Sequence, residues 1–134
     1  LASDEMITEI IIPETDDSHI LYFDKVGSRK SVTIARINMG AKIKIENNLI
    51  KEAIISFGAL NKKPIRAENV EKYIIGKKID EINKSEFNQE LKAVVDKAIP
   101  GRYSQQYKRN AICGLGNNLR QKLEYMSLKE NSYE

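Results

Sequence analysis

The clearest pattern in the chain is an alternation of apolar and polar residues across the segment 31–46. Apolar side chains recur at every second position, and polar side chains fall between them. The apolar positions are Ile37, Met39, Ala41, Ile43 and Ile45, and the polar positions between them include Asn38, Lys42 and Lys44. Because successive side chains of a β-strand point to opposite faces, this period of two predicts a strand with one buried face and one solvated face.

The residues that follow predict a hairpin. Asn47 and Asn48 form a two-residue connection, and asparagine tolerates the positive φ angles that tight hairpin turns require. The run 49–60 is again apolar enough to form a strand. We therefore expect 49–60 to return antiparallel to the strand 31–46.

Two runs nearer the N-terminus predict further strands of the same sheet. Residues 6–12 are rich in β-branched side chains, and the run stops at Pro13, which has no N–H to donate to a neighbouring strand. The polar residues 16–19 then form a connection, and residues 20–23 resume an extended run. Together these patterns predict an antiparallel meander sheet of three to four strands.

After Pro64 the apolar period changes to that of a helix, and three helices are predicted. The first is short and stops at Gly76, the second opens at a capping box over 83–86 and ends before Pro100, and the third begins near Ser104. The apolar stripes of the three helices are, in order, Val70, Tyr73 and Ile74; Phe87, Leu91, Val94, Val95 and Ala98; and Ile112, Leu115, Leu119, Leu123 and Met126. Since the strands come first and the helices follow, the predicted fold class is α+β, with the antiparallel sheet packed on a three-helix layer.

Two glycines interrupt the third helical pattern. Gly114 and Gly116 each cost a helix about 1 kcal/mol relative to alanine, so we expect both to mark close packing against another element. Beyond this helix the apolar period is lost. We expect one domain over residues 1–128 and a flexible tail over 129–134.

Composition is that of a small globular domain and excludes several classes of protein. Of the 134 residues, 41% are hydrophobic and 31% are charged, and no apolar run approaches the roughly 20 residues that span a bilayer. The chain begins at Leu1 with neither an initiator methionine nor a signal-peptide pattern, so we expect it to start inside a longer gene product. A single cysteine excludes a disulfide, a zinc site or an iron–sulfur cluster held by one chain, and it suits the reducing cytoplasm.

The charges argue against a polyanion partner. The net charge is only +3, and the two signs alternate along the chain instead of forming blocks. The basic pairs 62–63 and 77–78 have no aromatic neighbours in sequence on which bases could stack, so we expect no nucleic-acid binding. The isolated cations Arg66 and Arg109 are expected to form salt bridges with neighbouring elements.

The chain has only one histidine and one cysteine, the residue types most often found as catalytic bases, nucleophiles and metal ligands. His19, the only histidine, lies in an acidic connection and is expected at the surface, whereas Cys113 lies between apolar helical positions and is expected to be a buried small hydrophobe. The segment 114–116 lacks the third glycine and the preceding strand of a dinucleotide fingerprint. The carboxylates of 14–17 lack the glycine and distal glutamate of a calcium loop. No catalytic residue and no metal ligand is assigned.

One turn is a better candidate for a binding site. Gly27 and Ser28 lie beside the cations Lys25, Arg29 and Lys30. A glycine-containing turn with exposed amides and nearby cations can hold an anionic or electron-rich group. From the residues alone, a solvated basic turn is the alternative interpretation.

Five segments, in order along the chain, resemble motifs of one protein family. They are Asp4–Pro13, Lys25–Arg29, Ile34–Ala41, Gly58–Ala67 and Ser104–Arg109. The second resembles a Lys-x-x-x-Arg turn, the fourth a Gly-Ala and Pro-x-Arg-Ala motif, and the last a Ser-x-x-Tyr-Arg-Arg helix start. Nearly the whole chain thereby resembles the C-terminal domain of the FAD-binding subunit of molybdenum hydroxylases, the xanthine dehydrogenase and carbon monoxide dehydrogenase group.

The resemblance implies a fold, cofactors and partners. The fold would be that of the CO dehydrogenase flavoprotein C-terminal domain. In such enzymes a molybdenum cofactor oxidises the substrate, electrons pass through two 2Fe-2S clusters, and FAD passes them to NAD or another acceptor. The implied partners are the N-terminal FAD domain of the same subunit, an iron–sulfur subunit and a molybdenum subunit that carries molybdopterin. FAD would be held mainly by the upstream domain, so the isolated chain is expected to be inactive.

The resemblance also implies roles for individual residues. Ile7 occupies the position at which the family places an apolar residue against the flavin, and Lys25 the position at which a lysine meets the flavin ring system. Gly27, Ser28 and Arg29 fall in a loop beside the flavin site. The implied function is to close the flavin site and support electron transfer through FAD. The alternative is a non-catalytic domain that serves assembly of the same complex.

Overall fold

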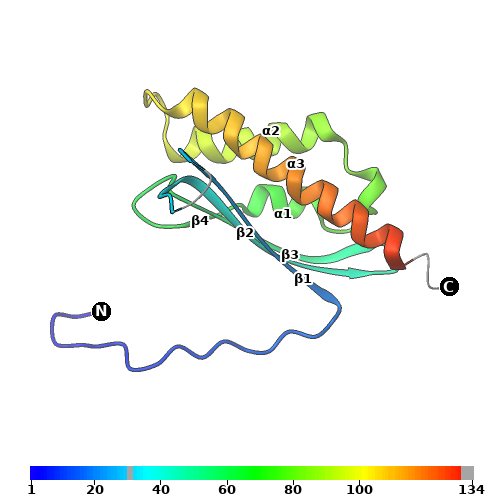
Figure 1. Cartoon of the computed structure of the whole chain (residues 1–134), viewed down its shortest axis with the longest axis horizontal. Coiled ribbons are helices and arrows are strands. Elements are labelled where there is room, and N and C mark those ends of the chain that lie inside the picture. The colour runs from blue at the N-terminus through cyan, green and yellow to red at the C-terminus, as the bar shows by residue number, and fades with distance from the viewer. Residues whose placement is uncertain (30–31, 131–134) are drawn as a thin grey trace.

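The fold has two layers, a four-stranded antiparallel sheet and three α-helices on one face of it (Figure 1). The computed structural model describes residues 1–29 and 32–130. The strands are β1 (His19–Gly27), β2 (Ala35–Glu46), β3 (Leu49–Gly58) and β4 (Ile65–Arg66), and the helices are α1 (Glu68–Ile74), α2 (Lys84–Ala98) and α3 (Gln105–Glu130), with a 3₁₀ helix at Ile79–Glu81. This is the α+β arrangement that the sequence predicted.

The sheet is a meander in which every strand pairs with its neighbour in sequence. The order is β1-β2-β3-β4, and the pairing of β1 with β2 reaches Gly27 opposite Ala35. The turn between β2 and β3 has φ angles of 51° at Asn47 and 62° at Asn48. The predicted two-residue hairpin is therefore confirmed.

The core lies between the inner face of the sheet and the helices. The predicted alternation of β2 is confirmed, since Ile37, Met39 and Ile43 are each 0% exposed. The helical residues buried in the same core include Val70, Ile74, Phe87, Leu91, Val95, Ile112, Leu115, Leu119 and Leu123. Each fully buried side chain of this size stabilises a fold by about 1.5–3 kcal/mol relative to its exposed state. The predicted stripes of α1 and α3 thus face the sheet, and the stripe of α2 packs against these two helices.

Local chemistry sets the ends of α2. The Oδ1 atom of Asn83 accepts hydrogen bonds from the N–H groups of Ser85 at 2.8 Å and Glu86 at 3.2 Å. The Glu86 carboxylate accepts a hydrogen bond from the Tyr73 hydroxyl at 3.0 Å, so only half of the predicted capping box forms. The helix ends before Pro100, which the sequence also predicted.

The two glycines of α3 have different surroundings. A Cβ atom on Gly116 would lie 2.2 Å from Leu91 Cδ1 and 3.2 Å from Phe87 Cε1, whereas a Cβ atom on Gly114 would meet nothing within 4 Å. The expectation of close packing is confirmed for Gly116 and wrong for Gly114. Gly116 lets α3 approach α2 closely.

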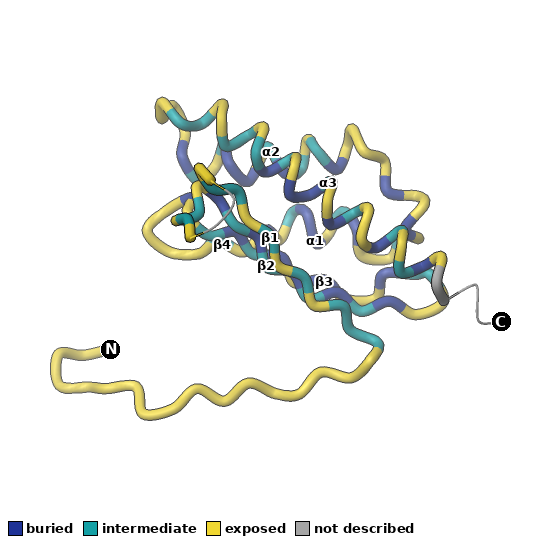
Figure 2. Tube along the Cα trace, in the orientation of Figure 1, coloured by how far each residue is buried: buried dark blue, intermediate teal, exposed yellow. Residues whose placement is uncertain are grey.

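The predicted strand at residues 6–12 is wrong. Residues 1–17, the N-terminal arm, are all exposed and form no strand. Figure 2 shows the arm as one exposed segment that runs apart from the sheet and the helices. A tendency to form strands expresses packing on a pleated surface, and the described residues offer the arm no neighbouring strand. The sequence also missed β4 and the 3₁₀ helix, which are only two and three residues long.

The outer face of the sheet carries a mixed apolar and basic surface. Leu21, Phe23 and Ile54 are 64%, 67% and 46% exposed. The strand register places Leu21 and Ile54 on either side of Lys42. In the described part of the chain, all three helices lie on the opposite face (Figure 1).

The last described residues belong to a helix. Helix α3 continues through Glu130, into the segment 129–134 that the sequence marked as a tail. Residues 131–134 lie outside the described residues, as do Lys30 and Ser31. None of the described helices is both long and apolar enough to cross a membrane.

Candidate functional site

The β1–β2 hairpin brings together the residues that were assigned to a flavin-site loop. Lys25 lies in β1, and Gly27 is the last residue of this strand, so Ser28 and Arg29 lead into the loop. The Lys25 ammonium group donates a hydrogen bond to the Thr33 carbonyl oxygen at 3.3 Å. Within the described residues this is the one side-chain hydrogen bond of Lys25, so two ammonium hydrogens remain available to a ligand.

A close approach of Gly27 and Thr33 shapes the loop. A Cβ atom at position 27 would lie 2.2 Å from Thr33 Cγ2 and 2.8 Å from Thr33 Oγ1. The Ser28 N–H group donates to the same Oγ1 atom at 3.2 Å. The absence of a side chain at Gly27 therefore allows the returning strand to pass this close.

The Arg29 guanidinium group turns back onto its own loop. Its Nε and Nη2 atoms donate to the Val32 carbonyl oxygen at 3.0 and 2.7 Å. Val32 has a φ of 43°, a left-handed conformation that is strained for a β-branched residue. The two hydrogen bonds from Arg29 help to hold the loop in this conformation.

Two hollows open at this end of the hairpin. One of about 440 Å³ is lined by Lys25, Val26, Gly27, Ser28, Arg29 and Thr33. The other, of about 340 Å³, is lined by Ser28, Arg29, Val32, Thr33, Ile34, Ala35 and Arg36. Their linings combine cations with hydroxyl groups, which suits contact with one polar edge of a ring system.

The hairpin and the arm are separate in the structure. Ile7 lies in the N-terminal arm and is 61% exposed, and the arm runs apart from both layers (Figure 1). The domain by itself therefore does not bring Ile7 to Lys25. A shared contact with one ligand requires that the arm pack against something else.

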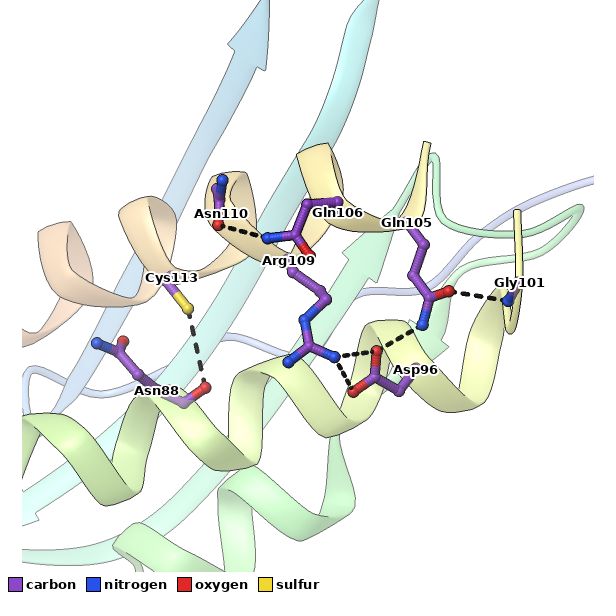
Figure 3. Close-up of polar contacts among 8 residues, drawn as sticks. All are labelled: Asn88, Asp96, Gly101, Gln105, Gln106, Arg109, Asn110 and Cys113. Atoms are coloured by element: carbon purple, nitrogen blue, oxygen red, sulfur yellow. Dashed lines mark hydrogen bonds and ion pairs between the residues drawn. The ribbon is translucent and has the colours of Figure 1, made fainter. Parts of the chain in front are cut away.

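The isolated cation Arg109 is paired, as the sequence predicted. Its Nη1 atom, on α3, donates to both carboxylate oxygens of Asp96, on α2, at 2.8 and 2.6 Å (Figure 3). Gln105 also donates to Asp96 at 2.7 Å and accepts from the Gly101 N–H group at 2.8 Å. The hydrogen bond from Gln105, followed by the hydrogen bond and charge of Arg109, lowers the pKa of Asp96. This cluster joins the two helices.

The single cysteine and the single histidine each contact a neighbouring residue of the fold. Cys113 lies on α3 and is half-buried, not fully buried as expected; its thiol is 3.8 Å from the Asn88 carbonyl oxygen of α2 (Figure 3), and partial burial raises its pKa. His19 is less exposed than expected, since its side chain is 12% exposed and its Nδ1 atom lies 2.7 Å from Asp16 Oδ1. Hydrogen bonds from Ser18 and His19 lower the pKa of Asp16 to about 2. Residues 1–29 and 32–130 contain no group of three His, Cys, Asp or Glu side chains that could hold a metal ion.

Comparison with known families identifies the family of the domain that carries this hairpin. Residues 22–122 match the family described as the CO dehydrogenase flavoprotein C-terminal domain. The chain belongs to this family. The match covers most of β1 with Lys25, the β1–β2 loop, β2 to β4 and the greater part of the helical layer.

Relatives of this flavoprotein C-terminal domain are much longer proteins. The glyceraldehyde dehydrogenase medium chain of Sulfolobus acidocaldarius is 27% identical over 108 residues, which are 81% of this chain and 38% of that protein. The Cu,Mo-CO dehydrogenase in its cyanide-inactivated form matches with a TM-score of 0.64 and 19% identity over 80% of this chain and 36% of that chain. The carbon monoxide dehydrogenase of Hydrogenophaga pseudoflava that lacks the Mo-pyranopterin moiety gives a TM-score of 0.65 and 15% identity, covering 80% of this chain and 37% of that chain. The structural matches show a shared fold, and the chain spans well under half the length of each relative.

One further hollow of this flavoprotein C-terminal domain was not predicted from the sequence. A hollow of about 900 Å³ is lined by Ser28, Arg36, Tyr103, Ser104, Tyr107 and Lys108. The segments Ile34–Ala41 and Ser104–Arg109 contain most of these residues, but the sequence identified the first only as a strand and the second only as a helix start. The fold brings the two segments together, and no spacing along the chain signals that contact.

Proposed function

We propose that this chain is the C-terminal portion of the FAD-binding subunit of a xanthine dehydrogenase-like molybdenum hydroxylase. It closes the flavin site and supports electron transfer from iron–sulfur clusters through FAD to NAD or another acceptor. The observation that carries the proposal is the family match over residues 22–122, which includes the exposed Lys25 at the hairpin. The dehydrogenase names of its relatives support the oxidoreductase class.

Lys25 suits a contact with a flavin ring. One hydrogen of its ammonium group bonds to the Thr33 carbonyl oxygen, which leaves two hydrogens for a ligand. A positive charge near the pyrimidine edge of a flavin favours the anionic reduced form. FAD, when bound, supplies the reversible electron-transfer chemistry. The contribution of Lys25 is to bind one edge of the ring and to bias its charge.

The N-terminal arm suits a contact with an N-terminal FAD domain of the same subunit. Ile7, Ile10, Ile11 and Ile12 are 61%, 78%, 79% and 82% exposed. A run of exposed apolar side chains marks a surface that packs against another part of a protein. With the arm packed on the upstream domain, Ile7 excludes water from one side of the flavin.

The remaining partners belong to the same class of enzyme. An iron–sulfur subunit with 2Fe-2S clusters and a molybdenum subunit with molybdopterin deliver the electrons, and the complex works in the cytoplasm. As the family resemblance implies, the upstream domain holds most of the FAD molecule, and the hairpin hollows, of about 340 and 440 Å³, supply this domain's share of the contacts. The isolated chain is therefore expected to bind FAD weakly and to be inactive.

The test is the substitution Lys25→Ala in the complete, reconstituted complex. Loss of the ammonium group is expected to lower the flavin midpoint potential by tens of millivolts and to slow acceptor turnover. Lys51→Ala, at an exposed position near the other end of the sheet, is the matched control and should change neither quantity. Spectroelectrochemistry measures the potential.

The competing function is a non-catalytic domain that serves assembly. On that reading Lys25→Ala leaves the potential and the turnover per assembled complex unchanged and reduces only the yield of complex. Size-exclusion chromatography of the same samples separates the two results. An unchanged potential in a fully assembled variant would rule out the flavin contact.

A further inference from the structure

The largest of the hollows described above is built from segments that are far apart in sequence. Ser28 comes from the β1–β2 loop and Arg36 from β2, whereas Tyr103, Tyr107 and Lys108 come from the α2–α3 turn and the first turn of α3. Its volume of about 900 Å³ is within the usual range for small-molecule sites. It is also larger than the two hairpin hollows beside Lys25.

The hollow carries positive charge that the described residues do not neutralise. Arg36 and Lys108 line it, and Arg102 lies close enough to act on Lys108 electrostatically. Burial, together with the charges of Arg102 and Arg36, lowers the pKa of Lys108. Among residues 1–29 and 32–130, none of these three cations forms an ion pair with a carboxylate.

One of these cations is fixed in position. The Lys108 ammonium group donates a hydrogen bond to the Ala59 carbonyl oxygen in the β3–β4 connection. A carbonyl oxygen satisfies one donor without cancelling the charge. The remaining donors of Lys108, and the guanidinium group of Arg36, can therefore meet an anion in the hollow.

The same hollow presents two aromatic rings. Tyr103 is fully exposed and Tyr107 is 49% exposed, although aromatic side chains of this size usually bury much of their area. Exposed tyrosine rings provide flat apolar faces for stacking. Ser28 and Ser104 add hydroxyl groups that can donate or accept hydrogen bonds.

We propose that this hollow binds a nucleoside diphosphate, with the phosphates at Arg36 and Lys108 and the base against Tyr103 and Tyr107. Two phosphates match the charge of the cation cluster, and arginine binds phosphate oxygens through paired N–H groups. A planar base matches the tyrosine rings, because stacking needs only a π face. The site shares Ser28 with the hairpin but does not include Lys25, so it stands independently of the flavin contact.

Other ligands of the same charge fit the hollow less well. An acidic peptide offers carboxylates but no aromatic ring for the tyrosines. A polynucleotide needs a basic track several phosphates long, whereas the charge here is gathered at one hollow of a chain whose net charge is +3. A nucleoside diphosphate contacts the cations through its phosphates and the tyrosine rings through its base.

The experiment is a calorimetric titration of the full chain with ADP, with adenosine and with inorganic phosphate. ADP is expected to bind with 1:1 stoichiometry and more tightly than either adenosine or phosphate. Arg36→Gln and Tyr107→Ala should each weaken ADP binding by about tenfold or more. Lys51→Gln removes the same charge as Arg36→Gln at an exposed site remote from the hollow and should leave the affinity unchanged.

A loss of folding does not obscure this test. Tyr103 is fully exposed, so Tyr103→Ala should retain the native circular dichroism spectrum while it weakens ADP. Lys25→Ala should leave ADP binding intact, which separates this site from the flavin contact. The proposal fails if ADP does not saturate the chain, if Lys51→Gln weakens binding as much as Arg36→Gln does, or if an acidic peptide displaces ADP.

Discussion

Arg66 donates from Nε to both carboxylate oxygens of Glu71, at 3.0 and 3.1 Å. The Glu71 side chain is 5% exposed, whereas that of Arg66 is 56% exposed. The Glu71 Oε1 atom also accepts a hydrogen bond from the Ile55 N–H group, on β3, at 2.8 Å. One carboxylate therefore ties α1 to β3 and β4. The pairing confirms the salt bridge expected for Arg66 and gives the Pro-x-Arg-Ala segment a structural role.

Removal of this carboxylate should destabilise the fold. Glu71→Ala leaves the Ile55 N–H group buried without its acceptor and is expected to lower the free energy of unfolding by about 1–3 kcal/mol. Glu71→Gln keeps one oxygen acceptor and should cost less. Urea denaturation measures both. Glu68→Ala, at an exposed position of the same helix, is the control, and an equal effect at Glu68 and Glu71 would show that the buried carboxylate is not the cause.

The two glycines of α3 should respond oppositely to alanine. Gly114→Ala meets nothing within 4 Å and should stabilise the chain by about 1 kcal/mol through its better helix propensity. Gly116→Ala would place a methyl group 2.2 Å from Leu91 Cδ1, a fully buried side chain, and overpacking of this kind costs about 1–3 kcal/mol. Thermal unfolding of both variants gives the order. A Gly116→Ala variant as stable as Gly114→Ala would contradict the close approach of α2 and α3.

The Asp96 cluster should make stability depend on acid pH. Because its pKa in the folded chain lies below the ordinary value of 3.8, the ionised carboxylate stabilises the fold above pH 3.8, and this contribution is lost as the pH falls through the folded pKa. Asp96→Asn should therefore be less stable than the unmodified chain at pH 7, and the difference should shrink toward zero in stronger acid. Chemical denaturation at a series of pH values measures it.

A matched substitution tests whether this pH dependence belongs to the cluster. Asp17→Asn removes the same charge in the exposed N-terminal arm, where it should change stability little at any pH. Arg109→Gln should reduce the effect of Asp96→Asn, since the two side chains are hydrogen-bonded. A stability difference for Asp96→Asn that persists unchanged at low pH would exclude the ionised form as its source.

The hairpin beside Lys25 should tolerate a side chain at Gly27 only if Thr33 is shortened. Gly27→Ala places a Cβ atom 2.2 Å from Thr33 Cγ2, so we expect a loss of about 1–3 kcal/mol from overpacking. Thr33→Ala removes Cγ2 and Oγ1, and the double variant should recover part of that loss. A double-mutant cycle from urea denaturation provides the coupling energy, and strictly additive effects would contradict the contact.

Much of the fold follows from the sequence because burial imposes a period on it. The positions from Ile37 to Ile45 alternate because one face of β2 is covered by a helix, and the stripe on α2 has a helical period because that helix packs against α1 and α3. The turn at Asn47 and Asn48 follows from local backbone preferences alone. These elements need only neighbours within the same segment to be recognised.

The features that the sequence missed depend on contacts between distant segments. Residues 6–12 have the composition of a strand, but a strand also needs a partner, and composition cannot supply one. Gly114 and Gly116 look alike in sequence, and only the position of Leu91 distinguishes them. The hollow between Arg36 and Lys108 arises where β2 meets the start of α3. In the hairpin, the motif located Lys25, but the contacts of Thr33 with Gly27 and Ser28 came only from the structure.

The exposed N-terminal arm makes the solitary chain prone to aggregation. Residues 6–12 combine high strand propensity with a single charged side chain and no proline, the properties of segments that stack into cross-β assemblies. β1 lies at one edge of the sheet, where its unpaired backbone groups can template the arm of another molecule. Concentrated preparations of the isolated polypeptide should therefore turn turbid with time. Trimming residues 1–13, or producing the chain together with whatever covers the arm, should keep the solution clear.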